Sequence, residues 1–413
     1  MNRLVRRLLK ATLGGLSAIA LAIPTAHAVV PLALPPGTAF TPLAVSLITT
    51  PGPVKAVDGK IHLSYELFVT NALAADVRLD RVTVRDARTH GELASLDGSV
   101  LAGSANPLAS PLPGEGSDVE RAVPGPPVLG GSAQWVVWIN IALDASKRLP
   151  GQIEHEIDGT VLSPDGAEVR TFQATVARTF LQTRAPLDLR APVLPGQWYV
   201  SEGCCDNTHH RRGLAPINGV LDVPQRFAID WFKVGPGNRT WVGDPGRLTS
   251  YLSFRQPVLA AAAGRVVEVQ DGLADNPPPV PPTIPPIQDT VGNHVTLEVG
   301  PGRYLLYAHL ERGSVKARYG DRVTPGQPLG LIGNSGNSTT PHLHFQVMTT
   351  REFFPTDSPP FTFRSFAVIG QVRPRIWDDN LGLQPTGELP LTCSPFAGRH
   401  RDEMPLDRNI IQF

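Results

Sequence analysis

The chain has 413 residues, and its 37 basic and 37 acidic side chains give a formal net charge of zero. No block of like charge stands out, which argues against nucleic acid as a partner. The 42 prolines and 39 glycines favour an all-β protein with many turns over a helical one. The length predicts more than one domain.

The first 28 residues have the pattern of an export signal. Four basic residues stand among the first ten, an apolar stretch follows over 11–23, and Ala26-His27-Ala28 is typical of a cleavage site. We therefore expect removal after Ala28 and a periplasmic or secreted protein. No later segment predicts a transmembrane helix, because none is long and apolar enough.

Residues 29–181 are predicted to form an immunoglobulin-like β-sandwich. Apolar and polar residues alternate along 61–69, so one face of this strand should be buried. Similar runs separated by turn residues follow at 77–85, 134–143, 152–162 and 168–179. Catalytic residue types do not cluster here, and His62 and His155 are expected at the surface. The interpretation is an accessory domain.

A linker over 182–200 is expected to lead into a second, compact antiparallel β domain over 201–413 with long loops and a C-terminal extension. It contains predicted strands at 256–270 and a predicted hairpin at 292–310. The proline-rich segment 274–289 between them is expected to be a stiff surface loop.

The three cysteines are Cys204, Cys205 and Cys393. An exported chain can form disulfides, so Cys393 could bridge one of the neighbouring pair and leave one thiol over. A zinc site built on cysteines is disfavoured, because adjacent cysteines lack the usual two-residue spacer.

Several histidines and one carboxylate in the second domain suggest a metal site. His342 and His344 are two residues apart in an apolar run, so both rings would leave the same face of a strand. Asp230 is also embedded in apolar residues, where an unpaired charge would be costly. Either a metal or an ion pair with Arg226 or Arg255 would explain it.

His309 near a strand end and the pair His209–His210 in a polar segment could complete such a site. Two imidazoles and one carboxylate on zinc, with an open fourth position, are a standard catalytic ligand set. Taken one at a time, these histidines would equally fit a hydrogen-bonded core position or a solvated loop.

Four motifs occur in a fixed order: GRVVEV at 264–269, YAHL at 307–310, GDRVTPGQPLG at 320–330 and GNSGNSTTPHLHF at 333–345. As an ordered set they resemble the LytM/lysostaphin-type zinc metallopeptidases of peptidase family M23, with a match over roughly 201–350. The resemblance implies one Zn²⁺ ion and an exported endopeptidase that cleaves peptide bonds in peptidoglycan.

The resemblance also implies roles for individual residues. His344 and Asp230 would be zinc ligands. His342 would be the general base that takes a proton from the attacking water, and His309 would support the transition state.

The sequence departs from the family at its first motif. His-x-x-x-Asp would require a histidine four residues before Asp230, where this chain has Arg226. A variant of the family has an Asn-x-His sequence ahead of a QRxAxD strand, and Asn207-Thr208-His209 resembles it. His209 is therefore expected as the third ligand, with His210 as the second choice.

Two other functions compete with this one. A catalytically inactive LytM-like protein could regulate or bind cell-wall hydrolases, but such members lose metal ligands that this chain keeps. Alternatively, the protein could hydrolyse another glycine-containing protein or peptide. The zinc endopeptidase is the favoured hypothesis.

Overall fold

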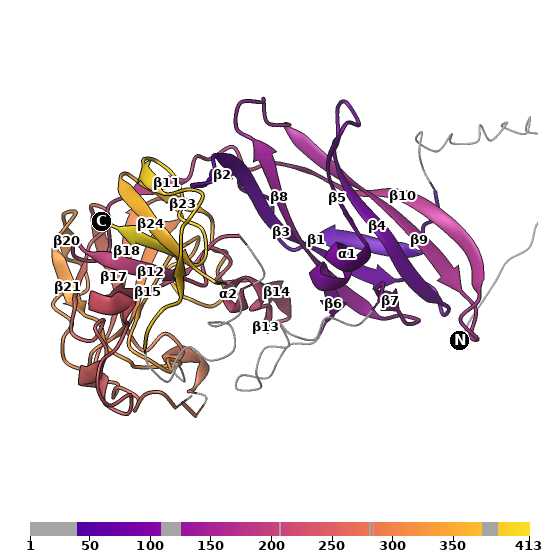
Figure 1. Ribbon diagram of the computed structural model, residues 1–413. Coiled ribbons are helices and arrows are strands. Elements are labelled where there is room, and N and C mark those ends of the chain that lie inside the picture. Colours follow the sequence, from indigo (N-terminus) through magenta and orange to yellow (C-terminus); the bar gives the residue numbers. More distant parts are fainter. Residues whose placement is uncertain (1–38, 109–124, 206–207, 281, 284, 374–386) are drawn as a thin grey trace, which may run out of the picture. The chain divides into compact units, whose positions relative to one another are not determined.

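The computed structural model describes residues 39–108, 125–205, 208–280, 282–283, 285–373 and 387–413 (Figure 1). The chain divides into Met1–Phe40 and one compact unit, Thr41–Phe413. The predicted export signal lies outside the described residues. Strands dominate the rest, which confirms the all-β prediction. In the part of the chain that the structure describes, no helix has the length and apolar character that crossing a membrane requires.

The N-terminal part of the compact unit forms two five-stranded sheets. The first has the order β1-β3-β8-β6, with β2 on β3: β1 (Leu43–Leu47), β2 (Val54–Lys55), β3 (Lys60–Asn71), β6 (Ala105–Pro107) and β8 (Gln134–Asp144). The second has the order β10-β9-β4-β5, with β7 on β4: β4 (Asp76–Asp86), β5 (Glu92–Asp97), β7 (Val128–Leu129), β9 (Gln152–Leu162) and β10 (Glu168–Phe180). Helix α1 (Gly98–Ser104) follows β5. The five strands predicted between 61 and 179 are confirmed.

Buried side chains of both sheets form a single hydrophobic core. Leu63 and Leu67 of β3 share it with Val77 and Leu79 of β4 and with Ile157 of β9. The two sheets therefore pack on each other, as a sandwich requires. The immunoglobulin-like type and the domain limits stay predictions.

The outer face of β3 is also buried, which alternation alone does not predict. His62, Ser64 and Glu66 are each no more than 5% exposed. Leu214 and Val223 pack on the same sheet through Trp138 of β8. The expectation that His62 lies at the surface was therefore wrong, and its ring contacts Asp58.

The same expectation was wrong for His155 of β9, whose buried ring contacts Tyr65.

The C-terminal part of the unit is organised by an eleven-stranded sheet. Its order is β20-β17-β18-β19-β22-β15-β12-β27-β24-β25, with β26 on β24. These strands are β12 (Gln197–Ser201), β15 (Ile229–Val234), β17 (Gly264–Gln270), β18 (Asn293–Gly300), β19 (Arg303–Leu310), β20 (Arg322–Val323), β22 (Leu343–Met348), β24 (Phe366–Val372), β25 (Leu391–Thr392), β26 (Gly398–His400) and β27 (Asn409–Gln412). The hairpin predicted at 292–310 is confirmed by β18 and β19.

Shorter elements complete this part. Three two-stranded sheets pair β11 (Leu187–Leu189) with β23 (Phe361–Phe363), β13 (Ala215–Ile217) with β14 (Val220–Asp222), and β16 (Pro257–Leu259) with β21 (Pro328–Leu331). The helical turns are α2 (His209–Arg212), η2 (Pro236–Asn238), η3 (Leu248–Ser250) and η4 (Ile287–Asp289). The predicted linker 182–200 thus contains β11 and most of β12, and the proline-rich segment contains η4.

The central strands of the large sheet have two different faces. Trp231 of β15, Tyr307 of β19 and Phe345 of β22 are fully buried in the main core. The residues next to them, such as Asp230 and His344, point to the opposite face because side chains alternate along a strand. The candidate site lies on that face.

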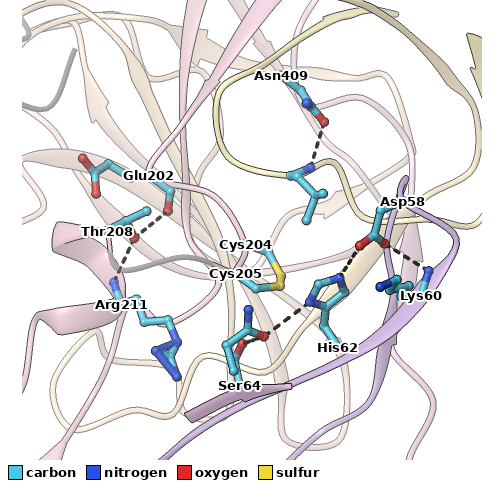
Figure 2. The surroundings of a disulfide bond; sticks show 12 residues. Asp58, Lys60, His62, Ser64, Glu202, Cys204, Cys205, Thr208, Arg211 and Asn409 are labelled. Atoms are coloured by element: carbon cyan, nitrogen blue, oxygen red, sulfur yellow. Dashed lines mark hydrogen bonds and ion pairs between the residues drawn. A yellow bond between two sulfur atoms is a disulfide. The ribbon is translucent and has the colours of Figure 1, made fainter. Parts of the chain in front are cut away.

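The cysteines pair differently from the possibility considered above. Cys204 and Cys205 are bonded to each other, and Cys393 is free and exposed. Figure 2 shows this disulfide with His62 and Ser64 of β3 among its surroundings. This disulfide joins two neighbouring residues, and Cys393 forms no bridge to either of them.

Candidate metal centre

Three neighbouring strands bring four of the predicted site residues together. Asp230 on β15 lies directly opposite His344 on β22, and His344 lies opposite Ala308 on β19. Residues directly opposite each other in an antiparallel pair share a face and are close neighbours. His342, two residues before His344, has its ring 4.9 Å from that of His309.

A bulge turns His309 toward the site. Between Leu310 and Tyr307 the β19 strand has two residues where β18 has one, and His309 has a φ of 60°. A bulge of this kind re-aims a side chain that strict alternation would send to the other face. Ala308 and His309 therefore both stand beside His344, whose ring centroid is 5.7 Å from that of His309.

The orientation of His344 is set by a residue that the sequence reasoning missed. Gln346 donates from Nε2 to the carbonyl of Pro224 at 2.8 Å, so its Oε1 is free to accept from His344 Nε2, also at 2.8 Å. In the neutral ring this leaves Nδ1 as the lone-pair atom, 2.9 Å from Asp230 Oδ1. Two residues beyond a strand histidine is the position on the same face, which is the signal that could have pointed to Gln346.

The third histidine at the site is His210. Its Nδ1 donates to the carbonyl of Ala228 at 3.4 Å, and its Nε2 lies 3.4 Å from Asp230 Oδ2. His209 instead has a side chain that is 47% exposed and contacts Glu202 at 3.2 Å. Successive residues of a helical turn point in directions about 100° apart, so α2 can direct only one of the two toward Asp230. The structure thus places His210 next to Asp230, whereas the side chain of His209 points to Glu202.

The donor atoms fit a zinc ion. One ligand atom from each of His210, Asp230 and His344 lies within 4.8 Å of the others, and all three residues are buried. Two imidazole nitrogens and a carboxylate oxygen are ligands that Zn²⁺ accepts, and three protein ligands leave a position open for chemistry. In both histidines the other ring nitrogen is held by a hydrogen bond, which is how metal-binding imidazoles are usually oriented.

The two remaining histidines are fixed through Nδ1. His342 donates to the carbonyl of Thr340 at 2.7 Å and stacks on Phe232, and His309 donates to the carbonyl of Ser335 at 2.8 Å. The Nε2 of His342 lies 3.3 Å from Asp230 Oδ2. In both rings Nδ1 is thus engaged by a backbone carbonyl, which leaves Nε2 for other contacts, in His342 the contact with Asp230.

One buried carboxylate dominates the charges of the site. Burial would raise the pKa of Asp230, but His210 and His342 outweigh it and hold the pKa well below its usual range. Burial would likewise lower the pKa of His342, yet the charge of Asp230 raises it. The pKa values of His210 and His309 are lowered, in each case chiefly by burial. The site therefore combines a charged carboxylate with imidazoles that differ in basicity.

The arginines that could have explained Asp230 have other partners. Arg255 contacts Glu311 at 2.6 Å, and Arg226 contacts Glu66 at 2.8 Å. The ion-pair alternative to a metal is therefore excluded for these two arginines.

A cavity of about 330 Å³ adjoins the site on the same face of the sheet. Its walls include Leu306, Thr296, Phe353 and Phe354, with Glu268 also lining it. Phe353 connects the cavity to the site, because its ring lies 6.4 Å from that of His344. A molecule bound at the histidines could extend into this space.

Comparison with known proteins identifies one family model that covers part of the site. Residues 251–355 match the family model described as Peptidase family M23. This segment contains His309, His342 and His344 but neither His210 nor Asp230, so the placement of the last two rests on the structure.

Three curated relatives are similar over short stretches. Glycyl-glycine endopeptidase ALE-1 of Staphylococcus capitis is 41% identical over 80 residues, which are 19% of this chain and 22% of that protein. Lysostaphin of Staphylococcus simulans is 42% identical over 122 residues, 29% of this chain and 21% of that protein. Peptidoglycan DD-endopeptidase ShyA of Vibrio cholerae is 40% identical over 57 residues, 14% of this chain and 13% of that protein. The chain thus spans about a fifth or less of the length of these relatives.

Proposed function

Because residues 251–355 match the model of peptidase family M23, we propose that the chain is a zinc-dependent endopeptidase that cleaves peptide bonds in peptidoglycan. The observation that carries this proposal is the cluster of His210, Asp230 and His344, whose ligand atoms lie within 4.8 Å of one another beside two further histidines. The three relatives, which are named as endopeptidases or as lysostaphin, support the reaction class. Export to the periplasm or the medium would bring the enzyme to this substrate.

We assign the zinc ligands to His210, Asp230 and His344. His210 takes the place expected for His209, because its Nε2 faces Asp230 while His209 contacts Glu202. When bound, zinc supplies a Lewis acid that polarises the peptide carbonyl and makes a water molecule more acidic. Gln346 and the Ala228 carbonyl would hold the two imidazoles in the orientation that binding needs.

His342 and His309 would act on the substrate. His342 has Nδ1 engaged by Thr340, so Nε2 is the atom that would take a proton from the attacking water and return it to the leaving amine. His309 is held beside it through Ser335 and would stabilise the transition state.

The cavity next to His344 would receive part of the peptide. Apolar residues such as Leu306 and Phe353 line it together with polar ones, among them Glu268, Glu352 and His294. Such a space suits a substrate side chain with an apolar stem and a polar or positively charged end. Binding there would place the neighbouring peptide bond at the histidines.

The test uses the purified chain from residue 29. Metal analysis should find about one zinc per chain, as one catalytic site requires. The protein should release peptides from isolated peptidoglycan, and His344→Ala should abolish both zinc binding and release. Substrates with glycyl-glycine bridges and substrates with direct cross-links, assayed in parallel, would identify the bond.

Two outcomes would contradict the proposal in different ways. Protein that contains no zinc, together with undigested peptidoglycan, would remove the enzyme hypothesis. Protein that binds zinc through His210 and His344 but releases nothing would instead favour the binding or regulatory alternative.

A further inference from the structure

Arg226, four residues before Asp230, is clamped by a carboxylate of the sandwich. Its Nε donates to Oε1 of Glu66 at 2.9 Å and its Nη2 donates to Oε2 at 2.8 Å, while Nη1 donates to Asp357. Glu66 is fully buried and Arg226 is 3% exposed. A two-pronged contact of this kind fixes direction as well as distance.

Arg211, the residue after His210, reaches the same strand. Its Nη2 donates to the backbone carbonyls of Tyr65 at 3.2 Å and Ile139 at 2.7 Å, which belong to β3 and β8. The same nitrogen lies 4.0 Å from Oε1 of Glu66. Two segments that bear proposed ligands are thus tied to one place on the sandwich.

The contact continues on either side of the arginines. Trp138 of β8, directly opposite Glu66, has the guanidinium of Arg212 at 5.5 Å from its ring centroid. Leu214 and Val223 pack against Trp138. Helix α2 has only four residues, so its position depends on contacts such as these, together with the Thr208 cap and the contact of His210 with the Ala228 carbonyl.

We infer that Glu66 is a positioning residue for the metal centre, which it orders through Arg226 and Arg211. The inference rests on the proposed function, since it concerns the zinc ligands His210 and Asp230. A buried ion pair adds little net stability compared with apolar packing, so stability alone is a weak reason for this arrangement. The sandwich is then a structural part of the active site. Arg226, at the position where the family's first motif has a histidine, makes the two-pronged contact with Glu66 instead.

The test compares Glu66→Gln with Glu154→Gln in the chain from residue 29. Glu154 is the control, because it is also a buried sandwich carboxylate, and its partners among the described residues are Arg178 at 2.7 Å and His90 at 2.7 Å, neither of which lies in a ligand-bearing segment. Competition with a chromophoric chelator would measure zinc affinity. Loss of an outer contact of a metal ligand typically weakens metal binding roughly ten- to hundred-fold. Because Glu66 acts one contact further out, through the two arginines, we expect a loss near the lower end of this range for Glu66→Gln and no loss for Glu154→Gln.

Arg226→Lys serves as a second variant that keeps the charge and loses the two-pronged geometry. We expect an intermediate loss of zinc affinity. The inference is overturned if folded Glu66→Gln binds zinc as tightly as the unchanged protein, or if Glu154→Gln weakens binding equally.

Hydrogen exchange of the zinc-free protein provides a readout that does not depend on the proposed function. The amides of Arg211 and Arg212 donate to Thr208 and should exchange faster in Glu66→Gln than in Glu154→Gln. If the unchanged protein binds no zinc, the proposed function fails. If Glu66→Gln leaves hydrogen exchange over 208–214 unchanged, the positioning role of Glu66 fails separately.

Discussion

Asp230 and His344 are 114 residues apart in the sequence, yet Oδ1 of the carboxylate lies 2.9 Å from Nδ1 of the imidazole. The pairing of β15 with β22 puts them opposite each other, on the face away from the main core. A single strand register therefore creates the centre of the site. A shift of that register by one residue would turn Asp230 into the core and separate the pair.

Substitution of His210 should abolish zinc binding, whereas substitution of its neighbour His209 should not. His210→Ala removes a ligand atom from the cluster and should abolish stoichiometric zinc binding and peptide release. His209→Ala is the matched control and should change zinc affinity by less than about two-fold, since its ring is held by Glu202. Zinc content after gel filtration checks both. Loss of zinc in His209→Ala with retention in His210→Ala would reverse the ligand assignment.

Gln346 should matter through the atom it presents to His344. Gln346→Leu removes the acceptor for Nε2 and leaves the Pro224 carbonyl unsatisfied, so zinc should bind roughly ten- to hundred-fold more weakly. Gln346→Glu retains an acceptor for Nε2 but loses the donor to the Pro224 carbonyl, so it should recover only part of that affinity. Chelator competition measures the series, and equal affinity in the Leu variant and the unchanged protein would show that Gln346 does not orient the ligand.

Thr296→Val should separate stability from substrate binding. The Thr296 hydroxyl is buried with no partner among the described residues, so its removal should raise the free energy of unfolding by about 1 kcal/mol. Because the hydroxyl oxygen is inaccessible, its removal takes no contact away from a molecule in the cavity, so KM and kcat should stay near their original values. Urea unfolding and steady-state kinetics test the two parts. An unchanged or lower free energy of unfolding would contradict the prediction.

His155 should make the stability of the protein depend on pH. Burial lowers the pKa of His155 to about 4, whereas an unfolded histidine titrates near 6.5. Between these values the unfolded chain binds the extra proton, so the free energy of unfolding should fall as pH drops from about 6.5 to about 4, by about 3 kcal/mol in total. Other groups titrate in this range too, so the test is the difference from His155→Gln. Parallel curves for the two proteins would contradict the prediction.

The sequence by itself determined the features that depend on neighbours along the chain. Alternation predicted the long strands of the sandwich, and the hairpin at 292–310 followed from two apolar runs around a glycine-rich turn. The His342-x-His344 spacing placed two imidazoles on one face, and Asp230 in its apolar run required a partner. These signals are local, because the period of a strand is written in consecutive residues.

Only the tertiary structure decided how those pieces meet. The turn of α2 points His210 rather than His209 toward Asp230, and the bulge in β19 turns His309 toward His342. The outer face of β3 is buried because segments more than a hundred residues later cover it, so His62 and Glu66 lie inside the fold. Alternation shows that a strand has two faces, but which face is covered, and by what, depends on contacts between distant parts of the chain.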